Sequence, residues 1–175
     1  HVDLAAGTAT GVNGILHIAN VTGSNHVDLI VGDDRANVLS GLDGNDLLRG
    51  GRGDDVLAGG TGSDDLYGGA DNDTYIVDPN LGTLRLFEDG GTVVMGVAYR
   101  GGTDSIDLSH LTQSVTFSLL LGNNSLGTGQ LQMRLSSNSN TPAPEYFENV
   151  FGSLTSPNSL TGNAANNLLV GGGGN

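Results

Sequence analysis

Several residue types that usually build cores and active sites are scarce or missing in this chain of 175 residues. Cysteine is absent, which excludes disulfide bonds, thiolate zinc sites and cysteine nucleophiles. Aromatic residues make up 5% and apolar residues 37%, so a large globular core is not expected. No stretch reaches the ~20 apolar residues of a membrane span. Something other than apolar burial must therefore help to stabilise the fold.

Positive charge is also scarce. Lysine is absent, and six basic residues face nineteen acidic ones, which gives a net charge of −13. Such a surface repels nucleic acid and anionic lipid and attracts cations. The chain also contains 30 glycines, each of which loses much conformational entropy on folding. Calcium is the expected ligand, because hard cations prefer carboxylate and carbonyl oxygens.

A period of nine residues runs from Gly23 to Ile76. Its six copies are GSNHVDLIV (23–31), GDDRANVLS (32–40), GLDGNDLLR (41–49), GGRGDDVLA (50–58), GGTGSDDLY (59–67) and GGADNDTYI (68–76). Every copy begins with glycine. Position six is Asp28, Asn37, Asp46, Asp55, Asp64 or Asp73, and position eight is Ile30, Leu39, Leu48, Leu57, Leu66 or Tyr75. Chance does not produce three positions in register six times, so the period indicates a structural repeat.

Each repeat position has a physical role. The first four residues turn tightly, and glycine reaches the positive φ angles that such turns need. The last three form a short strand whose middle side chain points inward. Two nonapeptides then make one coil of a flattened spiral, so aspartates eighteen residues apart face each other. With the turn carbonyls they supply about six oxygen ligands, which suits calcium better than magnesium.

These repeats resemble the haemolysin-type calcium-binding repeats of RTX proteins, with GGRGDDVLA and GGTGSDDLY as the best matches. The resemblance implies a right-handed parallel β-roll, type I secretion, and folding on meeting extracellular calcium, with about three to five ions bound. It also implies that the position-six side chains and the turn carbonyls are the ligands. The candidate side-chain ligands are Asp28, Asn37, Asp46, Asp55, Asp64 and Asp73, paired as Asp28 with Asp46, Asp46 with Asp64, and Asp55 with Asp73. The candidate turn residues are Gly41, Asp43, Gly44, Gly50, Gly51, Arg52, Gly53, Gly59, Gly60, Thr61, Gly62, Gly68, Gly69, Ala70 and Asp71.

Two repeats depart from the pattern. Asn37 is a neutral ligand at best, and the turn Gly23–Val27 is poor in glycine, so sites that use them should be weak or empty. The motif returns in 153–161 and 162–170 with Asn158 and Asn167 in place of aspartate. We expect these coils to close without calcium, through side-chain amides.

The domain organisation follows from these segments. We expect an all-β chain with the β-rich end of a preceding module in 1–22, the calcium-binding roll in 23–76, and the start of the next roll in 153–175. Segment 77–152 is expected to be a β-rich spacer or wider coils of the same solenoid, with strands near 83–88, 105–109, 114–122 and 130–136. Residues 20–24 match 149–153 at a spacing of 129, which predicts a tandem module. The chain begins at His1 and stops within a glycine run, so we expect an internal piece of a longer protein.

No catalytic constellation stands out. None of the four histidines has metalloprotease spacing, and Ser109-His110 near Asp107 lacks the nucleophile-elbow motif of hydrolases. The leading interpretation is a secreted, non-enzymatic bacterial module of a long adhesin, surface-layer or filament protein, with neighbouring copies or cell-surface glycans as further partners. The alternatives are a calcium-binding secretion appendage of a type I secreted protease, lipase, epimerase or toxin, and carbohydrate binding by 77–151.

Overall fold

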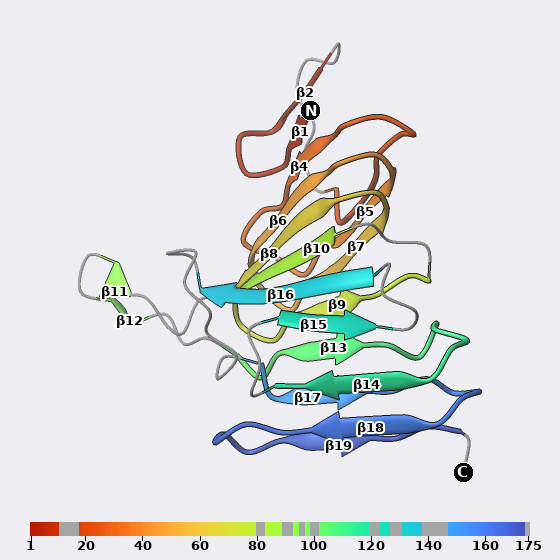
Figure 1. Cartoon of the computed structure of the whole chain (residues 1–175). Helices are drawn as coiled ribbons and strands as arrows, with labels where there is room; N and C mark the ends of the chain where they lie inside the picture. Colours follow the sequence, from red (N-terminus) through yellow and green to blue (C-terminus); the bar gives the residue numbers. More distant parts are fainter. Residues whose placement is uncertain are drawn as a thin grey trace.

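The fold is a stack of flattened coils built from strands. The computed structural model describes residues 1–10, 18–79, 83–88, 93–94, 97–98, 102–119, 123–126, 131–137 and 147–173. These residues form strands and turns and no helix, and so contain no helix that could cross a membrane. The coils descend from the N-terminal end to the C-terminal end, with the two termini at opposite ends of the stack (Figure 1).

Two long sheets form the faces of the stack. One has the order β15 (Asn123–Leu126), β16 (Leu131–Ser137), β10 (Thr83–Glu88), β8 (Asp64–Ala70), β6 (Leu47–Arg52), β4 (Leu29–Val31), β1 (Val2–Asp3) and β2 (Thr8–Ala9). The other has the order β19 (Leu168–Val170), β17 (Asn149–Phe151), β13 (Ser105–Asp107), β9 (Thr74–Ile76), β7 (Val56–Thr61), β5 (Val38–Asp43) and β3 (Asn20–Thr22). Two short pairs complete the described strands: β14 (Val115–Ser118) with β18 (Asn158–Thr161), and β11 (Val93–Val94) with β12 (Val97–Ala98).

The register shows how the nine-residue period becomes a coil. Successive nonapeptides alternate between the two sheets, so each strand pairs in parallel with the strand two repeats away. Leu48 lies beside Leu66 in one sheet, and Leu39 lies beside Leu57 in the other. Both spacings equal two repeats, as the sequence predicts. The predicted parallel β-roll is therefore confirmed.

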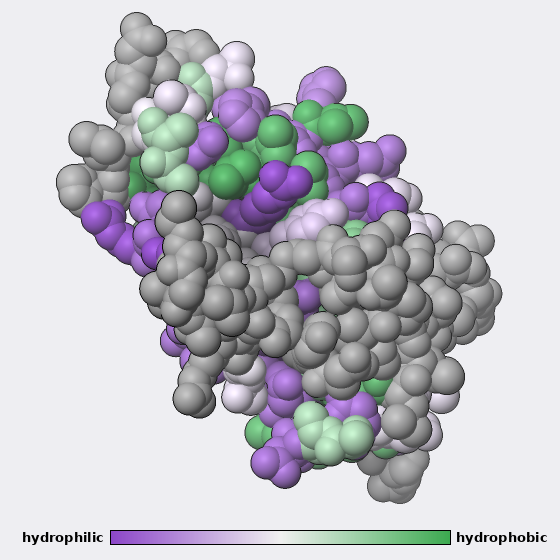
Figure 2. All heavy atoms as spheres, turned by 90° about the vertical axis from the view of Figure 1, so that its left-hand side faces the viewer, coloured by the Kyte–Doolittle hydropathy of each residue, from purple (hydrophilic) through white to green (hydrophobic). Residues whose placement is uncertain are grey.

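The core is the column of position-eight side chains between the sheets. All six are at most 1% exposed: Ile30, Leu39, Leu48, Leu57, Leu66 and Tyr75. Burying each aliphatic side chain of this kind stabilises the fold by roughly 1.5–3 kcal/mol before the conformational entropy is subtracted. The side chains on either side of position eight point outward. On the side of the molecule that Figure 2 shows, the described residues are a mixture of hydrophilic (purple) and hydrophobic (green) ones. The core is narrow and does not include the turns at the edges of the coils. Interactions other than apolar packing must therefore stabilise these turns.

Both sheets continue beyond the sixth repeat. In one sheet Ile106 of β13 lies between Tyr75 and Val150, which continues the apolar column. In the other, Leu86 of β10 pairs with Leu66. Strands β10, β13 and β17 therefore stack on the roll, although the spacing between partners now exceeds two repeats. The boundaries at residues 22, 76 and 152 remain predictions.

Candidate calcium-binding turns

The turns at the edges of the coils fall into two classes. In the turns that begin at Gly41, Gly50, Gly59 and Gly68, positions two and four all have positive φ: Leu42 (78°), Gly44 (146°), Gly51 (120°), Gly53 (96°), Gly60 (92°), Gly62 (121°), Gly69 (117°) and Asp71 (79°). L-residues rarely adopt these angles, so Leu42 and Asp71 hold a conformation that costs roughly 1–3 kcal/mol each. Residues 23–27 and 32–36, all of which the structure describes, have no positive φ. The repeat therefore changes its turn geometry after its second copy.

The position-six carboxylates form ladders across the coils. The Oδ1 atom of Asp46 accepts a hydrogen bond from the Asp28 N–H at 2.9 Å, and Asp64 Oδ1 accepts one from the Asp46 N–H at 2.9 Å. On the opposite edge, Asp55 accepts from the Asn37 N–H at 2.8 Å, and Asp73 accepts from the Asp55 N–H at 2.9 Å. Residues eighteen positions apart are thus brought together, and three of these four contacts join residues that the sequence pairs as ligands. The shared binding of an ion by each pair remains a prediction.

The second oxygen of four of these carboxylates has no hydrogen-bond partner. The Oδ2 atoms of Asp46, Asp55, Asp64 and Asp73 are buried and unpaired, and the four residues are at most 2% exposed. A buried polar atom without a partner costs roughly 1–3 kcal/mol, and more when it is charged. Four such atoms at equivalent positions indicate a ligand that the polypeptide does not supply.

The surroundings of these oxygens define the ligand. A Cβ atom added to Gly41 would overlap the Asp46 Oδ2 atom and lie 2.6 Å from the Gly59 carbonyl oxygen. On the other edge, a Cβ on Gly50 would overlap the Asp55 Oδ2 atom and lie 2.7 Å from the Gly68 carbonyl oxygen. Carboxylate and carbonyl oxygens therefore share the space that glycine leaves open. This oxygen-only donor set fits calcium.

The pKa values of the position-six aspartates also indicate that a cation is needed beside them. Burial raises the pKa of Asp64 from 3.8 to about 6 and that of Asp55 to about 7. Burial, together with the charges of Asp104 and Asp55, raises the pKa of Asp73 to about 9. The pKa of Asp46 is also raised, mainly by burial. Burial therefore disfavours the charged forms of these carboxylates when no cation is bound beside them.

The remaining turns satisfy their own position-six side chains. Asp28 Oδ2 accepts a hydrogen bond from the Ser24 N–H at 2.7 Å, and Asn37 Oδ1 accepts one from the Asp33 N–H at 2.8 Å. In the last coil, Asn167 Oδ1 accepts from the Asn163 N–H at 2.7 Å in the same way. Asp28 and Asn37 thus lack the unpaired oxygen of the other four candidates. This agrees with the expected weakness of the first two turns, although ligand assignments remain predictions.

Comparison with known proteins identifies the repeats. The family described as RTX calcium-binding nonapeptide repeat (4 copies) matches residues 22–57, 40–75 and 155–175. The chain carries RTX calcium-binding repeats. RTX repeats bind calcium, and the RTX β-roll is a structural domain rather than a catalytic one. No curated protein gives a significant match to the chain.

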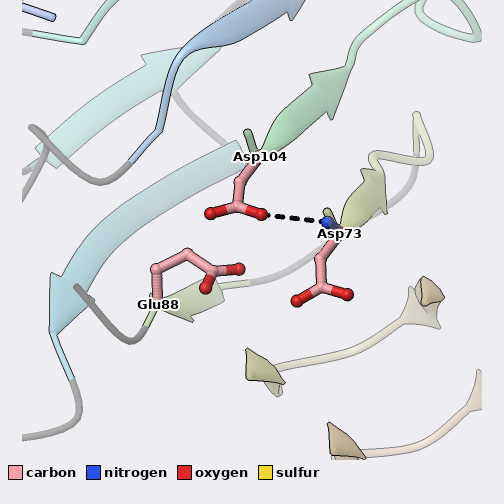
Figure 3. Close-up of side chains that lie close together, drawn as sticks. All are labelled: Asp73, Glu88 and Asp104. Atoms are coloured by element: carbon pink, nitrogen blue, oxygen red, sulfur yellow. Dashed lines mark hydrogen bonds between the residues drawn. The ribbon is translucent and has the colours of Figure 1, made fainter. Parts of the chain in front are cut away.

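Three acidic residues outside the repeats belong to the same column and were missed from the sequence. Asp104 Oδ1 accepts the Asp73 N–H at 2.9 Å, and Glu148 Oε2 accepts the Asp104 N–H at 2.8 Å, so the ladder of the RTX roll continues. Glu88 joins Asp73 and Asp104 from the end of β10 (Figure 3). No signal in the sequence points to them, because the partners are separated by 31 and 44 residues instead of eighteen.

The candidate hydrolase residues do not form a triad. The Ser109 N–H donates to Asp107 Oδ1 at 2.9 Å, which is a local turn contact. His110 Nδ1 lies 3.8 Å from Asp78 Oδ1 on a largely exposed surface. Asp104 is buried in the column of carboxylates. None of these contacts joins a serine hydroxyl to a histidine.

Proposed function

We propose that this chain is an extracellular structural module that folds when calcium binds to its RTX turns. The observation that carries the proposal is the set of four buried, unpaired Oδ2 atoms of Asp46, Asp55, Asp64 and Asp73. Each lies in a turn with positive φ angles at positions two and four, and backbone carbonyl oxygens lie beside the Asp46 and Asp55 carboxylates. Asp46 with Asp64 on one edge, and Asp55 with Asp73 on the other, supply the carboxylates of these sites.

Repulsion between the aspartates of the repeats makes folding depend on calcium. Eleven aspartates lie between Gly23 and Ile76, and only three arginines accompany them. One of these, Arg52, pairs with Asp34 at 3.1 Å on the exposed surface, where an ion pair contributes little. Calcium neutralises the buried carboxylates and lets the coils stack, so its binding free energy becomes folding free energy. An affinity of ~10⁻⁴–10⁻³ M, typical of extracellular modules, is sufficient.

The paired strands also support a tandem array. Asn20, Val21 and Thr22 of β3 pair with residues 38–40 of β5, and Asn149, Val150 and Phe151 of β17 pair with residues 168–170 of β19. The two pairs correspond at spacings of 129 and 130 residues, the period seen in the sequence. Both pairs lie in the same sheet, so a second copy of the module would continue that sheet without changing its register. The result is a long rigid rod suited to an adhesin, a surface layer or a filament.

One strand at the end of the stack fits this arrangement. Leu169 of β19 is 37% exposed, whereas the equivalent Leu39 in β5 is fully buried. Another RTX coil packed below β19 would bury Leu169 as the next coil buries Leu39. The partner expected from this chemistry is a further copy of the same module.

Two substitutions test the proposal. The double variant Asp55→Ala and Asp64→Ala removes one carboxylate from each column and should abolish the calcium-induced β signal in circular dichroism. Asp34→Asn is the matched control, because Asp34 is exposed and lies outside the columns. Retention of full calcium-induced order by the double variant would contradict the mechanism.

A further inference from the structure

A buried cluster of three carboxylates lies just beyond the last repeat. Asp73 precedes β9, Glu88 ends β10 and Asp104 precedes β13, so the cluster joins the sixth nonapeptide to the two coils that follow it (Figure 3). One oxygen from each residue lies within 4.8 Å of the others, and the three residues are 1%, 0% and 1% exposed. Three acidic groups are thus held together away from water.

The hydrogen bonds within the cluster leave one oxygen directed into it. Asp104 Oδ1 accepts the Asp73 N–H, and Asp73 Oδ1 accepts the Asp55 N–H, both at 2.9 Å. Asp73 Oδ2 is buried without a partner. A Cβ atom on Gly68 would overlap this oxygen and would also lie 2.5 Å from Glu88 Oε1. The unpaired Asp73 oxygen and the Glu88 carboxylate therefore border the same space beside Gly68.

The strand register explains why Glu88 reaches this space. Phe87 pairs with Tyr67, so the next residue on each strand places Glu88 beside Gly68. Glu88 thus takes the place that a position-one glycine would have on the following coil. A carboxylate stands where the regular repeat offers only a backbone carbonyl.

Tyr75 holds this arrangement in place. Tyr75 replaces the leucine or isoleucine of the other repeats at position eight and is fully buried. Its hydroxyl oxygen accepts the Gly68 N–H at 2.7 Å and lies within hydrogen-bond reach of the Glu88 carboxylate and the Phe87 carbonyl. The tyrosine therefore fixes both the glycine turn and the glutamate that border the space.

We propose that Asp73, Glu88 and Asp104 bind one further calcium ion, which fastens the coils of β10 and β13 to the end of the repeat array. The inference rests on the proposed calcium-dependent folding but uses two ligands from outside the repeats. All three side chains offer hard oxygen atoms, and a divalent cation offsets most of their combined charge. Asp73 also faces Asp55, so it belongs to the last repeat site and to the new one.

Counting bound calcium tests the inference. Calcium chloride is titrated into the calcium-free chain, and the ions bound are counted by equilibrium dialysis and calorimetry. Glu88→Gln and Asp104→Asn, which keep the side-chain shapes, should each bind one ion fewer than the wild type. Asp34→Asn, with the same change in charge on the exposed surface, should bind the full number. An unchanged count in both Glu88→Gln and Asp104→Asn would show that the cluster holds protons instead and would overturn the inference.

A further variant separates this inference from the proposed function. Asp64→Asn alters a repeat turn on the opposite edge and should lower the count whether or not the new site exists. If Asp64→Asn loses an ion while Glu88→Gln and Asp104→Asn do not, only the new site is wrong. If Asp64→Asn also loses none, calcium-dependent folding is wrong as well.

Terbium(III) gives a readout from the folded wild-type chain and so does not depend on the carboxylate variants folding. A terbium ion in the cluster lies close to the Tyr75 hydroxyl and emits when tyrosine is excited. Tyr75→Phe should lose a large part of this emission, and Asp34→Asn should keep it. Equal emission from Tyr75→Phe and the wild type would contradict the site.

Discussion

Removal of calcium should make the folding of this chain depend on pH in the direction opposite to ordinary acid denaturation. The buried aspartates of the RTX turns have folded-state pKa values above the 3.8 of an unperturbed aspartate, because burial disfavours their charged form. The folded chain therefore binds protons more tightly than the unfolded chain. Its calcium-free stability is fully present below about pH 4 and is lost as the pH rises through the folded-state values.

The magnitude follows from the individual shifts. Asp55 rises from 3.8 to about 7 and Asp64 from 3.8 to about 6, and both are at most 1% exposed. At ~1.4 kcal/mol per pKa unit, the ionised forms cost the fold roughly 4 and 3 kcal/mol. Asp73, with a pKa of about 9, extends the loss above neutrality. Domains are typically stable by only about 5–15 kcal/mol, so these carboxylates alone can unfold the calcium-free roll at neutral pH.

Far-UV circular dichroism of the calcium-stripped chain measures this effect. We expect a β spectrum near pH 5 that weakens towards about pH 8, and a spectrum with little pH dependence above neutrality when calcium is saturating. Acid should not unfold the chain by repulsion between positive charges, since the chain contains only six arginines and four histidines. A calcium-free roll that is equally folded at both pH values, or that melts on mild acidification, would refute the reasoning.

Three further predictions concern the turns and the core. Gly62→Ala should destabilise the calcium-bound chain by about 3 kcal/mol or more in urea unfolding, because φ is 121° and the new Cβ would overlap the Gly44 carbonyl oxygen. Gly171→Ala is the control and should change the urea midpoint little, because no atom lies within 4 Å of the new Cβ. Leu57→Ala should cost about 2–5 kcal/mol in the same assay, because Leu57 is fully buried; a cost below 1 kcal/mol would contradict a packed column. Tyr75→Phe should cost about 1–3 kcal/mol by leaving the Gly68 N–H without its acceptor, and an unchanged thermal midpoint would argue against that contact.

Much of the fold was predictable because the repeat has a single physical solution. A period of nine with an apolar position eight requires two strands per coil, and the eighteen-residue pairing of Leu48 with Leu66 follows from it. The strand predicted at 83–88 coincides with β10, and strands β13, β14 and β16 overlap the other predicted segments. The antiparallel pairing of β15 with β16 was not foreseen, because it depends on a chain reversal with no periodic signal.

The candidate site was predictable only in part. The sequence pattern names Asp28 and Asp46 alike as ligands, and nothing in it shows that the Ser24 N–H satisfies Asp28 while Asp46 keeps an unpaired oxygen. That distinction arises from the φ angles of the turns. Glu88 and Asp104 were out of reach of pattern analysis, because they join the column through strands separated by irregular lengths of chain.

A calcium titration of the chelator-treated chain, followed by far-UV circular dichroism at neutral pH with magnesium as the control, tests the central claim most directly. The buried, unpaired carboxylate oxygens predict a coil-to-β transition at roughly millimolar calcium that magnesium does not produce. A β spectrum that is already complete in chelator would contradict the account, because the coils would then stack without the ions that their turns are built to hold.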